Sequence, residues 1–313
     1  MKVDRTLDEL KNDSDFQLFF ENELEAMKNK VYEREYPELK ARSFLPNVKT
    51  ASLGQEFISF LEGDYVGQAA FIADGVVDIP TVDVYGSKNQ SPIRVIASSY
   101  RMGILEAAAA QQAGTSLEAR RARAMRDVIE NKLDDIAGFG AADYGLKGFA
   151  NHSAITATTL PDGASGSSST WASKTDDEKL ADLFTMSRTM VENSKGRLIP
   201  TDMVLPLSSY LEISTNTYLE TGITLLQHFL ANDPFIQRVD HWHMLDTAGS
   251  APDSSKRAVV YRRDEDVATF ELVQPFRIMG TDKSTMEWRV TAIAATGGVI
   301  VYKPLGMSYW DGM

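Results

Sequence analysis

The chain has 313 residues, enough for two domains or one large one, and its 43% hydrophobic and 24% charged residues are ordinary for a folded protein. It has no cysteine, which excludes disulfides, thiolate chemistry and cysteine zinc sites, and no apolar run reaches the roughly 18 residues of a membrane-spanning helix. The net charge of -12 comes with no evident basic face of the kind that sequence-specific DNA-binding proteins show. This charge fits either a surface that keeps the chain soluble or one that does not adhere to nucleic acid.

The first element in chain order is an amphipathic helix, which apolar residues at spacings of three and four predict over residues 15–36. These residues are Phe16, Phe19, Phe20, Leu24, Met27 and Val31. Charged residues, and no apolar segment, follow Met1, so a secretory signal is not expected. Pro37 and Pro46 then predict an extended arm to about Asn47. The surface that buries the aromatic stripe could belong to the same domain or to a neighbouring subunit.

Residues 50–95 are rich in glycine and in short β-prone runs. Polar and apolar residues alternate over 78–85, which predicts a strand, and the segment 86–92 is typical of a turn. A further strand is expected from Ile93. Together these signals predict a long two-stranded β-excursion, and because an isolated hairpin is marginal in water, it should rest on another surface.

The clearest helical signal lies at 105–137. An alanine-rich helix at 105–112 stops before Gly114, and Thr115 with Glu118 has the form of a capping box that starts a second helix, expected to end at Gly138. The apolar stripe of this second helix is Leu117, Met125, Val128, Ile129, Leu133 and Ile136. Its acidic and basic residues balance, and its roughly 22 residues would make a rod about 33 Å long.

The second half of the chain predicts an α+β fold. A low-complexity loop spans 161–175, and a helix led by Asp176 and Asp177 runs to about Asn193. A buried strand is expected at 203–205, and helices at 206–211 and 224–231. The strands expected after these helices lie at 239–244, 257–261, 267–273, 288–295 and 299–303, with turns at 264–266, 280–284 and 297–298.

No set of residues predicts catalysis or metal binding. His241 and His243 could share one face of a strand, but Asp240 would point to the opposite face and zinc needs further ligands. Ser165 does not lie in a Gly-x-Ser-x-Gly elbow, and the chain has neither a P-loop nor a dinucleotide-binding glycine motif. We therefore expect no catalytic residues, no cofactor and no metal, with an enzyme based on His241 and His243 as a remote alternative.

Residues 93–152 resemble the major capsid proteins of tailed phages and their relatives, the encapsulin shell proteins. The resemblance begins at Pro92-Ile93-Arg94-Val95 and continues through Leu105-Glu106-Ala107-Ala108 and the long charged helix. It ends at Gly138-Phe139-Gly140 and the run from Tyr144 to His152, while the near-terminal Tyr302-Lys303-Pro304 resembles the family's last strand. The resemblance implies an α+β capsid fold: a 1–50 N-terminal arm, a 51–92 extended β-hairpin loop, a peripheral domain at 93–150 and 257–313 with a spine helix at 115–137, and an axial domain at 151–256.

The same resemblance implies a structural protein, not an enzyme, that self-assembles into pentamers and hexamers of an icosahedral shell around double-stranded DNA. Its partners would be itself, scaffolding and portal proteins and decoration proteins, with no membrane and no sequence-specific contact to the DNA. The chain would be located in the virion capsid, assembled in the host cytoplasm. Loops 161–175 or 246–256 could be tips at ring centres or simple connections. The alternative is an encapsulin-type compartment for cargo enzymes, which the long arm disfavours because encapsulins open with a short helix.

Some members of this family form isopeptide cross-links between a lysine of the extended loop and an asparagine of the peripheral domain. Lys88 is the only lysine in residues 50–94, but no asparagine follows Asn232, and the expected position reads Met286-Glu287-Trp288. We therefore expect no cross-linking. The chain also lacks, before the arm, the long helical pro-segment that serves some members as an internal scaffold. Either this segment was removed or a separate scaffolding protein does its work, and the initial Met1 favours the second reading.

Overall fold

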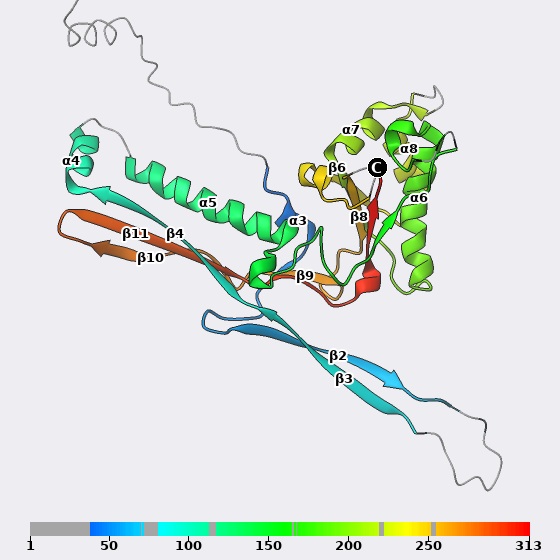
Figure 1. The fold of residues 1–313 in the computed structure, drawn as a ribbon, viewed down its shortest axis with the longest axis horizontal. Helices are drawn as coiled ribbons and strands as arrows, with labels where there is room; N and C mark the ends of the chain where they lie inside the picture. The colour runs from blue at the N-terminus through cyan, green and yellow to red at the C-terminus, as the bar shows by residue number, and fades with distance from the viewer. Residues whose placement is uncertain are drawn as a thin grey trace, which may run out of the picture. The chain divides into compact units, whose positions relative to one another are not determined.

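The computed structural model describes residues 38–69, 71, 81–112, 117–164, 166, 168–218, 222–251 and 255–313 (Figure 1). The chain divides into two units, Met1–Glu38 and Leu39–Met313, and every element below belongs to the second. The helix predicted at 15–36, the strand residues 78–80, the capping residue Thr115 and Ser165 lie outside the described residues. Within the described part, no helix is both long and apolar enough to cross a bilayer.

The largest sheet has five strands in the order β5-β13-β8-β6-β7. Their bounds are Ala157–Thr159 (β5), Asp202–Pro206 (β6), Arg238–Trp242 (β7), Arg257–Tyr261 (β8) and Met307–Asp311 (β13). The central strand β8 is antiparallel to both neighbours, whereas β5 and β7 lie parallel to β13 and β6. Every residue of β6 and β8 is buried, which explains why these strands read as nearly continuous apolar runs.

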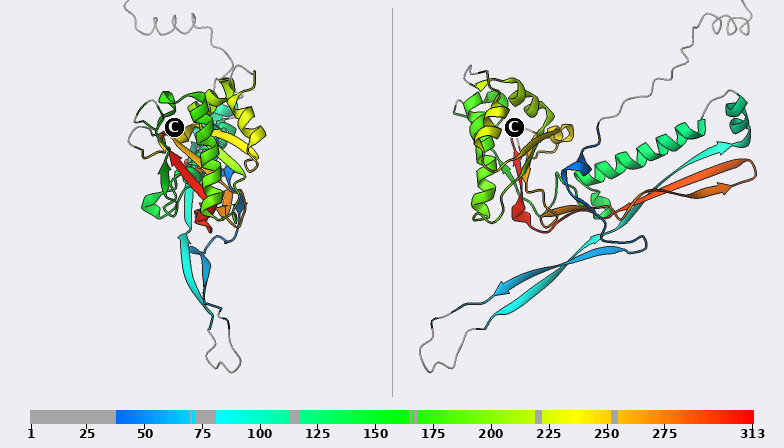
Figure 2. Two further views of the ribbon diagram at one scale, coloured as in Figure 1. Left: turned by 90° about the vertical axis from the view of Figure 1, so that its right-hand side faces the viewer. Right: turned by 180° about the vertical axis from the view of Figure 1, so that it is seen from behind.

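Helices α6 (Asp176–Asn193), α7 (Leu207–Thr215) and α8 (Leu225–Asn232) cover one face of this sheet (Figure 2). On that face Met203 and Val260 pack with Leu183 and other residues of the helices. Val204, on the opposite face, packs in a second core that contains Phe149. Side-chain alternation along β6 and β8 thus divides the interior into two cores on either side of one sheet.

A second sheet carries the long helix. Its strands β10 (Gln274–Lys283), β11 (Glu287–Thr296) and β4 (Arg94–Gly103) are antiparallel in that order, and α5 (Leu117–Phe139) packs along them (Figure 1). Met125, Ile129 and Leu133 of α5 are buried against β11, which confirms the predicted spine helix and its apolar stripe at these positions. Val128 is exposed, so its assignment to the buried stripe was wrong.

The remaining elements are a small sheet, a separate hairpin and several short helices. A three-stranded sheet of β1 (Asn47–Val48), β9 (Ala268–Glu271) and β12 (Gly298–Val301) links the two larger sheets in sequence, and β2 (Phe57–Val66) pairs with β3 (Asp83–Pro92) as a separate hairpin. The short helices are α3 (Ala41–Phe44), α4 (Ile104–Gln112), η1 (Ala142–Tyr144), η2 (Trp171–Ser173), η4 (His243–Thr247) and η5 (Pro304–Gly306).

Several strands differ from their predictions. The segment 86–92 is part of β3 and not a turn, and β10 was missed because it is an edge strand with almost every residue exposed, so that no buried face imposes alternation. β13 was also missed: it is the last strand, whereas Tyr302-Lys303-Pro304, expected to resemble the family's last strand, follows β12 outside any strand. The pairing of β8 and β13 with β6 and β5 means that the largest sheet joins strands from both sides of the expected domain boundary at 256/257.

Candidate assembly surface

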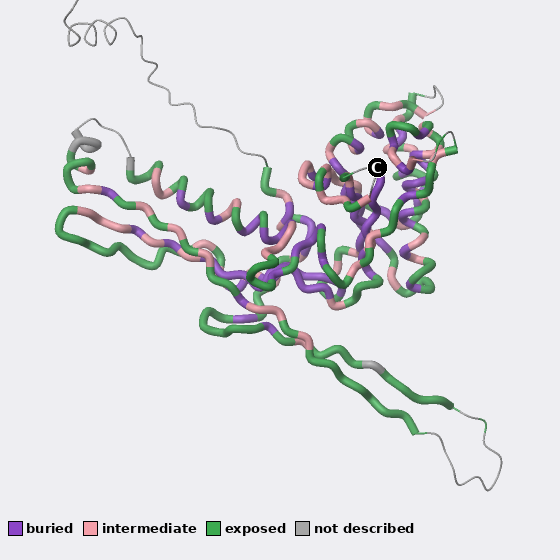
Figure 3. Tube along the Cα trace, in the orientation of Figure 1, coloured by how far each residue is buried: buried purple, intermediate pink, exposed green. Residues whose placement is uncertain are grey.

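The hairpin β2–β3 exposes most of its residues, among them Leu61, Tyr65 and Tyr85. The two strands pair along their whole length, from Phe57 opposite Pro92 to Val66 opposite Asp83. A two-stranded excursion therefore lies within the expected segment, but the turn predicted at 86–92 belongs to its second strand, and the strand that begins at Arg94 pairs with β11 and not with the hairpin. Figure 3 shows that exposure dominates its outer part. Because a two-stranded ribbon buries too little to be stable alone, its conformation depends on contacts elsewhere.

Only the base of the hairpin is attached to the body. Ile58 is buried in a small apolar cluster with Ile93 and Ile300, and the Phe60 ring meets the edge of the Tyr302 ring at a centroid distance of 5.0 Å. Ser91 Oγ donates a hydrogen bond to the Gly297 carbonyl at 2.9 Å. These contacts fix where the hairpin leaves the body and leave the rest of the ribbon without support in the described chain.

The root of the arm is part of the body, in contrast to the extended arm predicted to Asn47. Ala41, Phe44 and Leu45 are buried in the main core. Arg42 forms an ion pair with Glu130 of α5, and its backbone N–H donates to Asp134 Oδ1 at 3.3 Å. Two carboxylates of α5 are therefore used in contacts within the chain.

An aromatic cluster joins this root, the end of α5 and the largest sheet. The Phe44 ring lies 5.5 Å from that of Phe149 and 5.7 Å from that of Trp242, and Phe139 stacks on Trp242 at 5.7 Å. A Cβ at Gly138 would lie 2.5 Å from the Trp242 ring, so glycine lets the ring approach the helix.

The structure explains why glycine occurs at two positions of the segment that follows the spine helix, Gly140 and Gly148. Gly140 adopts φ +73°, and a Cβ there would lie 2.4 Å from the Leu146 carbonyl oxygen. A Cβ at Gly148 would lie 2.4 Å from the Gly140 nitrogen. These close approaches require glycine at both positions and turn the chain sharply after the spine helix.

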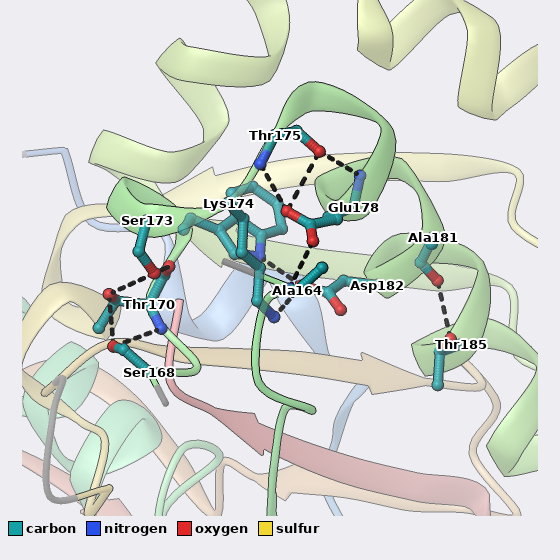
Figure 4. Close-up of polar contacts among 11 residues, drawn as sticks. Ala164, Ser168, Thr170, Ser173, Lys174, Thr175, Glu178, Ala181, Asp182 and Thr185 are labelled. Carbon is teal, nitrogen blue, oxygen red and sulfur yellow. Dashed lines mark hydrogen bonds and ion pairs between the residues drawn. The ribbon is translucent and has the colours of Figure 1, made fainter. Parts of the chain in front are cut away.

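The loop at 161–175, left open as a tip or a connection, is anchored at its C-terminal end. Trp171 is buried, and its Nε1–H donates to Asp182 Oδ2 at 3.0 Å. The Lys174 ammonium donates to the same oxygen at 2.6 Å (Figure 4). Burial raises the pKa of the Asp182 carboxyl, and the hydrogen bond from Lys174 opposes this shift. Thr175 and Glu178 form a capping box that begins α6, the helix start that the acidic pair Asp176-Asp177 had predicted.

The loop at 246–256 is held by the C-terminal strand. Arg257 donates to both carboxylate oxygens of Asp311, at 2.6 and 2.7 Å, and to the Ala150 carbonyl at 2.8 Å. Ser250 donates to Asp311 from both its N–H and its hydroxyl at 2.9 Å. Burial works against ionisation of Asp311, but the hydrogen bonds from Arg257 and Ser250 lower its pKa on balance. No local sequence signal pointed to this pair, because its members are far apart in the chain.

The two histidines considered for metal binding are not on one strand. β7 ends at Trp242, and His243 begins η4. His241 Nε2 lies 3.1 Å from Lys40 Nζ, and its ring packs against Tyr210 at a centroid distance of 4.9 Å. In the described residues, no group of three or more His, Cys, Asp or Glu side chains is placed to hold a metal ion.

Solved structures share this fold over nearly the whole chain. The capsid of Myoviridae phage XM1 superposes with a TM-score of 0.78 at 13% identity, covering 93% of this chain and 98% of that one. A chain of Mycobacterium phage Bobi gives 0.59 at 13% identity, covering 92% and 96%, and the capsid of cyanophage P-SCSP1u gives 0.57 at 9%, covering 92% of each. Identities this low establish the fold alone.

Comparison of sequences identifies the family. No curated protein matches the chain. The family described as major capsid protein matches it over residues 67–313, which takes in the hairpin's second strand, the spine helix and every strand of the two larger sheets. This match confirms the resemblance drawn from residues 93–152 and the α+β capsid fold that it implied. The chain therefore belongs to the major capsid protein family.

Proposed function

We propose that this protein self-assembles into pentamers and hexamers that form an icosahedral shell around double-stranded DNA. The observation that carries the proposal is the hairpin β2–β3, which exposes large apolar side chains and is attached to the body only at its base. Exposed apolar surface on this scale marks a site of association, and adjacent copies of the chain would complete it. The described body, in contrast, has its own buried cores and can fold before association.

The proposed role is structural and not catalytic. The net charge of -12 fits a wall that does not grip DNA, so the chain would enclose DNA without sequence-specific contacts. Besides itself, its partners would be scaffolding and portal proteins and decoration proteins, and its location the virion capsid after assembly in the host cytoplasm. The segments proposed for this role are the arm at 1–50, whose residues 41–48 pack in the body, the extended loop at 51–92, the peripheral domain at 93–150 and 257–313, and the axial domain at 151–256. The largest sheet contains strands from both sides of the boundary at 256/257.

The test is expression of the full chain, alone and with the scaffolding protein of the same virus, followed by negative-stain electron microscopy and sedimentation. Closed shells or rings with five- and six-fold symmetry are expected. A chain that sediments only as a monomer under both conditions would contradict the proposal. Particles that hold a cargo protein and no nucleic acid when purified from infected cells would favour a compartment over a viral shell.

A further inference from the structure

The register of the hairpin gives it two chemically different faces. In an antiparallel pair, directly opposite residues lie on the same face, and residues two apart along a strand share that face. Leu61 is opposite Lys88, and Tyr65 is opposite Val84, so these four side chains lie on one face together with Phe57. We call this the apolar face. The opposite face carries Glu62, Asp83, Val66 and Tyr85, and we call it the mixed face.

The mixed face is the one that the chain uses to hold its own hairpin. At the base of that face, Ile58 is buried, and Phe60 packs on Tyr302. The apolar face is free along the ribbon: Leu61 is 81% exposed and Tyr65 is 78% exposed. Exposed aromatic and aliphatic side chains that share one face, with the carboxylates on the other face, are typical of a surface that binds a partner.

The charges indicate what covers it. Among the described residues of the apolar face, Lys88 is the only one with a charged side chain, while Glu62 and Asp83 are on the mixed face. A second copy of this chain carries a net charge of -12, so a cationic, carboxylate-free face is complementary to it and the mixed face is not. We propose that the hairpin packs on a second copy of the chain through its apolar face, with Lys88 against a carboxylate of that copy, and that the mixed face remains accessible. This inference rests on the proposed function and adds the side of the ribbon that makes the contact.

The two tyrosines offer a matched test, since Tyr65 and Tyr85 lie on neighbouring pairs of the register but on opposite faces, and Tyr85 is 63% exposed. Because the chain has no cysteine, the variants Tyr65→Cys and Tyr85→Cys each carry a single thiol. Each variant is co-assembled with an excess of the natural chain, and the rate of maleimide labelling is compared between assembled and unassembled fractions. Assembly should slow labelling of the Tyr65→Cys thiol at least about tenfold and that of the Tyr85→Cys thiol less than about twofold, because a covered contact excludes the reagent.

Two variants that each introduce a glutamate test the proposed contact of Lys88 with a carboxylate of the second copy. Lys88→Glu should lower the assembled fraction at least about tenfold at low salt, whereas Ser87→Glu, one residue away on the mixed face, should change it less than about twofold. Circular dichroism of the unassembled variants should match the natural chain, because these side chains are exposed. Particles in which both thiols are equally protected, or in which Tyr85→Cys is the slower, would overturn the inference and leave the proposed function intact. A natural chain that never assembles would overturn both.

Discussion

Truncation of Leu133 should destabilise the chain and truncation of Val128 should not, although both belong to the apolar stripe read from the sequence of α5. Leu133 is fully buried and packs with Val290 and Ala292 of β11, whereas Val128 is 59% exposed. Leu133→Ala removes buried methyl groups and leaves a cavity, which typically costs about 2–5 kcal/mol of the free energy of unfolding. Val128→Ala removes little buried surface and replaces a β-branched residue with the best helix former, so its effect should stay within about 0.5 kcal/mol.

The measurement is urea unfolding of the unassembled chain, followed by circular dichroism at one fixed protein concentration. The protein concentration must be the same in every titration, because association of the folded chain would raise its apparent stability as the concentration rises. A fall of the unfolding midpoint for Leu133→Ala, with an unchanged slope and no fall for Val128→Ala, is expected. Equal losses for the two variants would refute the orientation of α5 and with it the assignment of the second sheet as the surface that supports the helix.

Three further outcomes follow from the buried polar groups and the sequence. Asp311→Asn leaves the buried Arg257 guanidinium without its anionic partner and should lower the free energy of unfolding by about 3–5 kcal/mol in urea titrations, and a loss below about 1 kcal/mol would contradict a buried ion pair. Burial, reinforced by Lys147, lowers the pKa of His152 to about 4. As the pH falls, His152 therefore binds a proton in the unfolded chain at a higher pH than in the folded chain. The free energy of unfolding should fall as the pH drops from about 6.5 to 4, and His152→Gln should flatten this part of the pH profile. Purified particles should run on denaturing gels as a single band near 34.6 kDa, with or without Lys88→Ala, and a ladder of larger bands would show cross-linking.

The elements that sequence reasoning located well are those that local signals determine. α6 begins where the acidic residues Asp176 and Asp177 predicted, because Thr175 caps it and its buried residues recur at helical spacing. α5 runs from Leu117 to Phe139, two residues beyond the predicted end at Ala137. The sharp turn that ends it depends on glycines at 138–148, which are visible in the sequence and whose close backbone approaches the structure explains.

The features that were missed depend on partners distant in the chain. β1 pairs with β9, placing Asn47 beside Phe270, and this contact together with the burial of Phe44 fixes the arm root to the body. No local pattern in residues 41–48 encodes that placement. β10 has register shifts near Arg277 and Gly280 and almost no buried residue, so its sequence lacks the alternation that identifies a strand. Val128 was misassigned because a helical stripe read from periodicity is wider than the one that a three-stranded sheet covers.

Because the exposed part of the hairpin lies outside the buried cores, substitutions in the cores and substitutions in the hairpin should affect different properties, unfolding and association respectively. Leu133 and Asp311 lie in interiors that the described body completes by itself, so changing them should alter unfolding of the unassembled chain. Leu61 and Tyr65 contribute almost nothing to those interiors, so changing them should leave unfolding untouched and alter association instead. A hairpin that existed only to stabilise its own chain would give the opposite result, because its apolar residues would then have to be buried in the single copy. The proposed contact with a second copy therefore predicts that substitutions at the exposed apolar side chains of the hairpin change association and leave unfolding of the single chain unchanged.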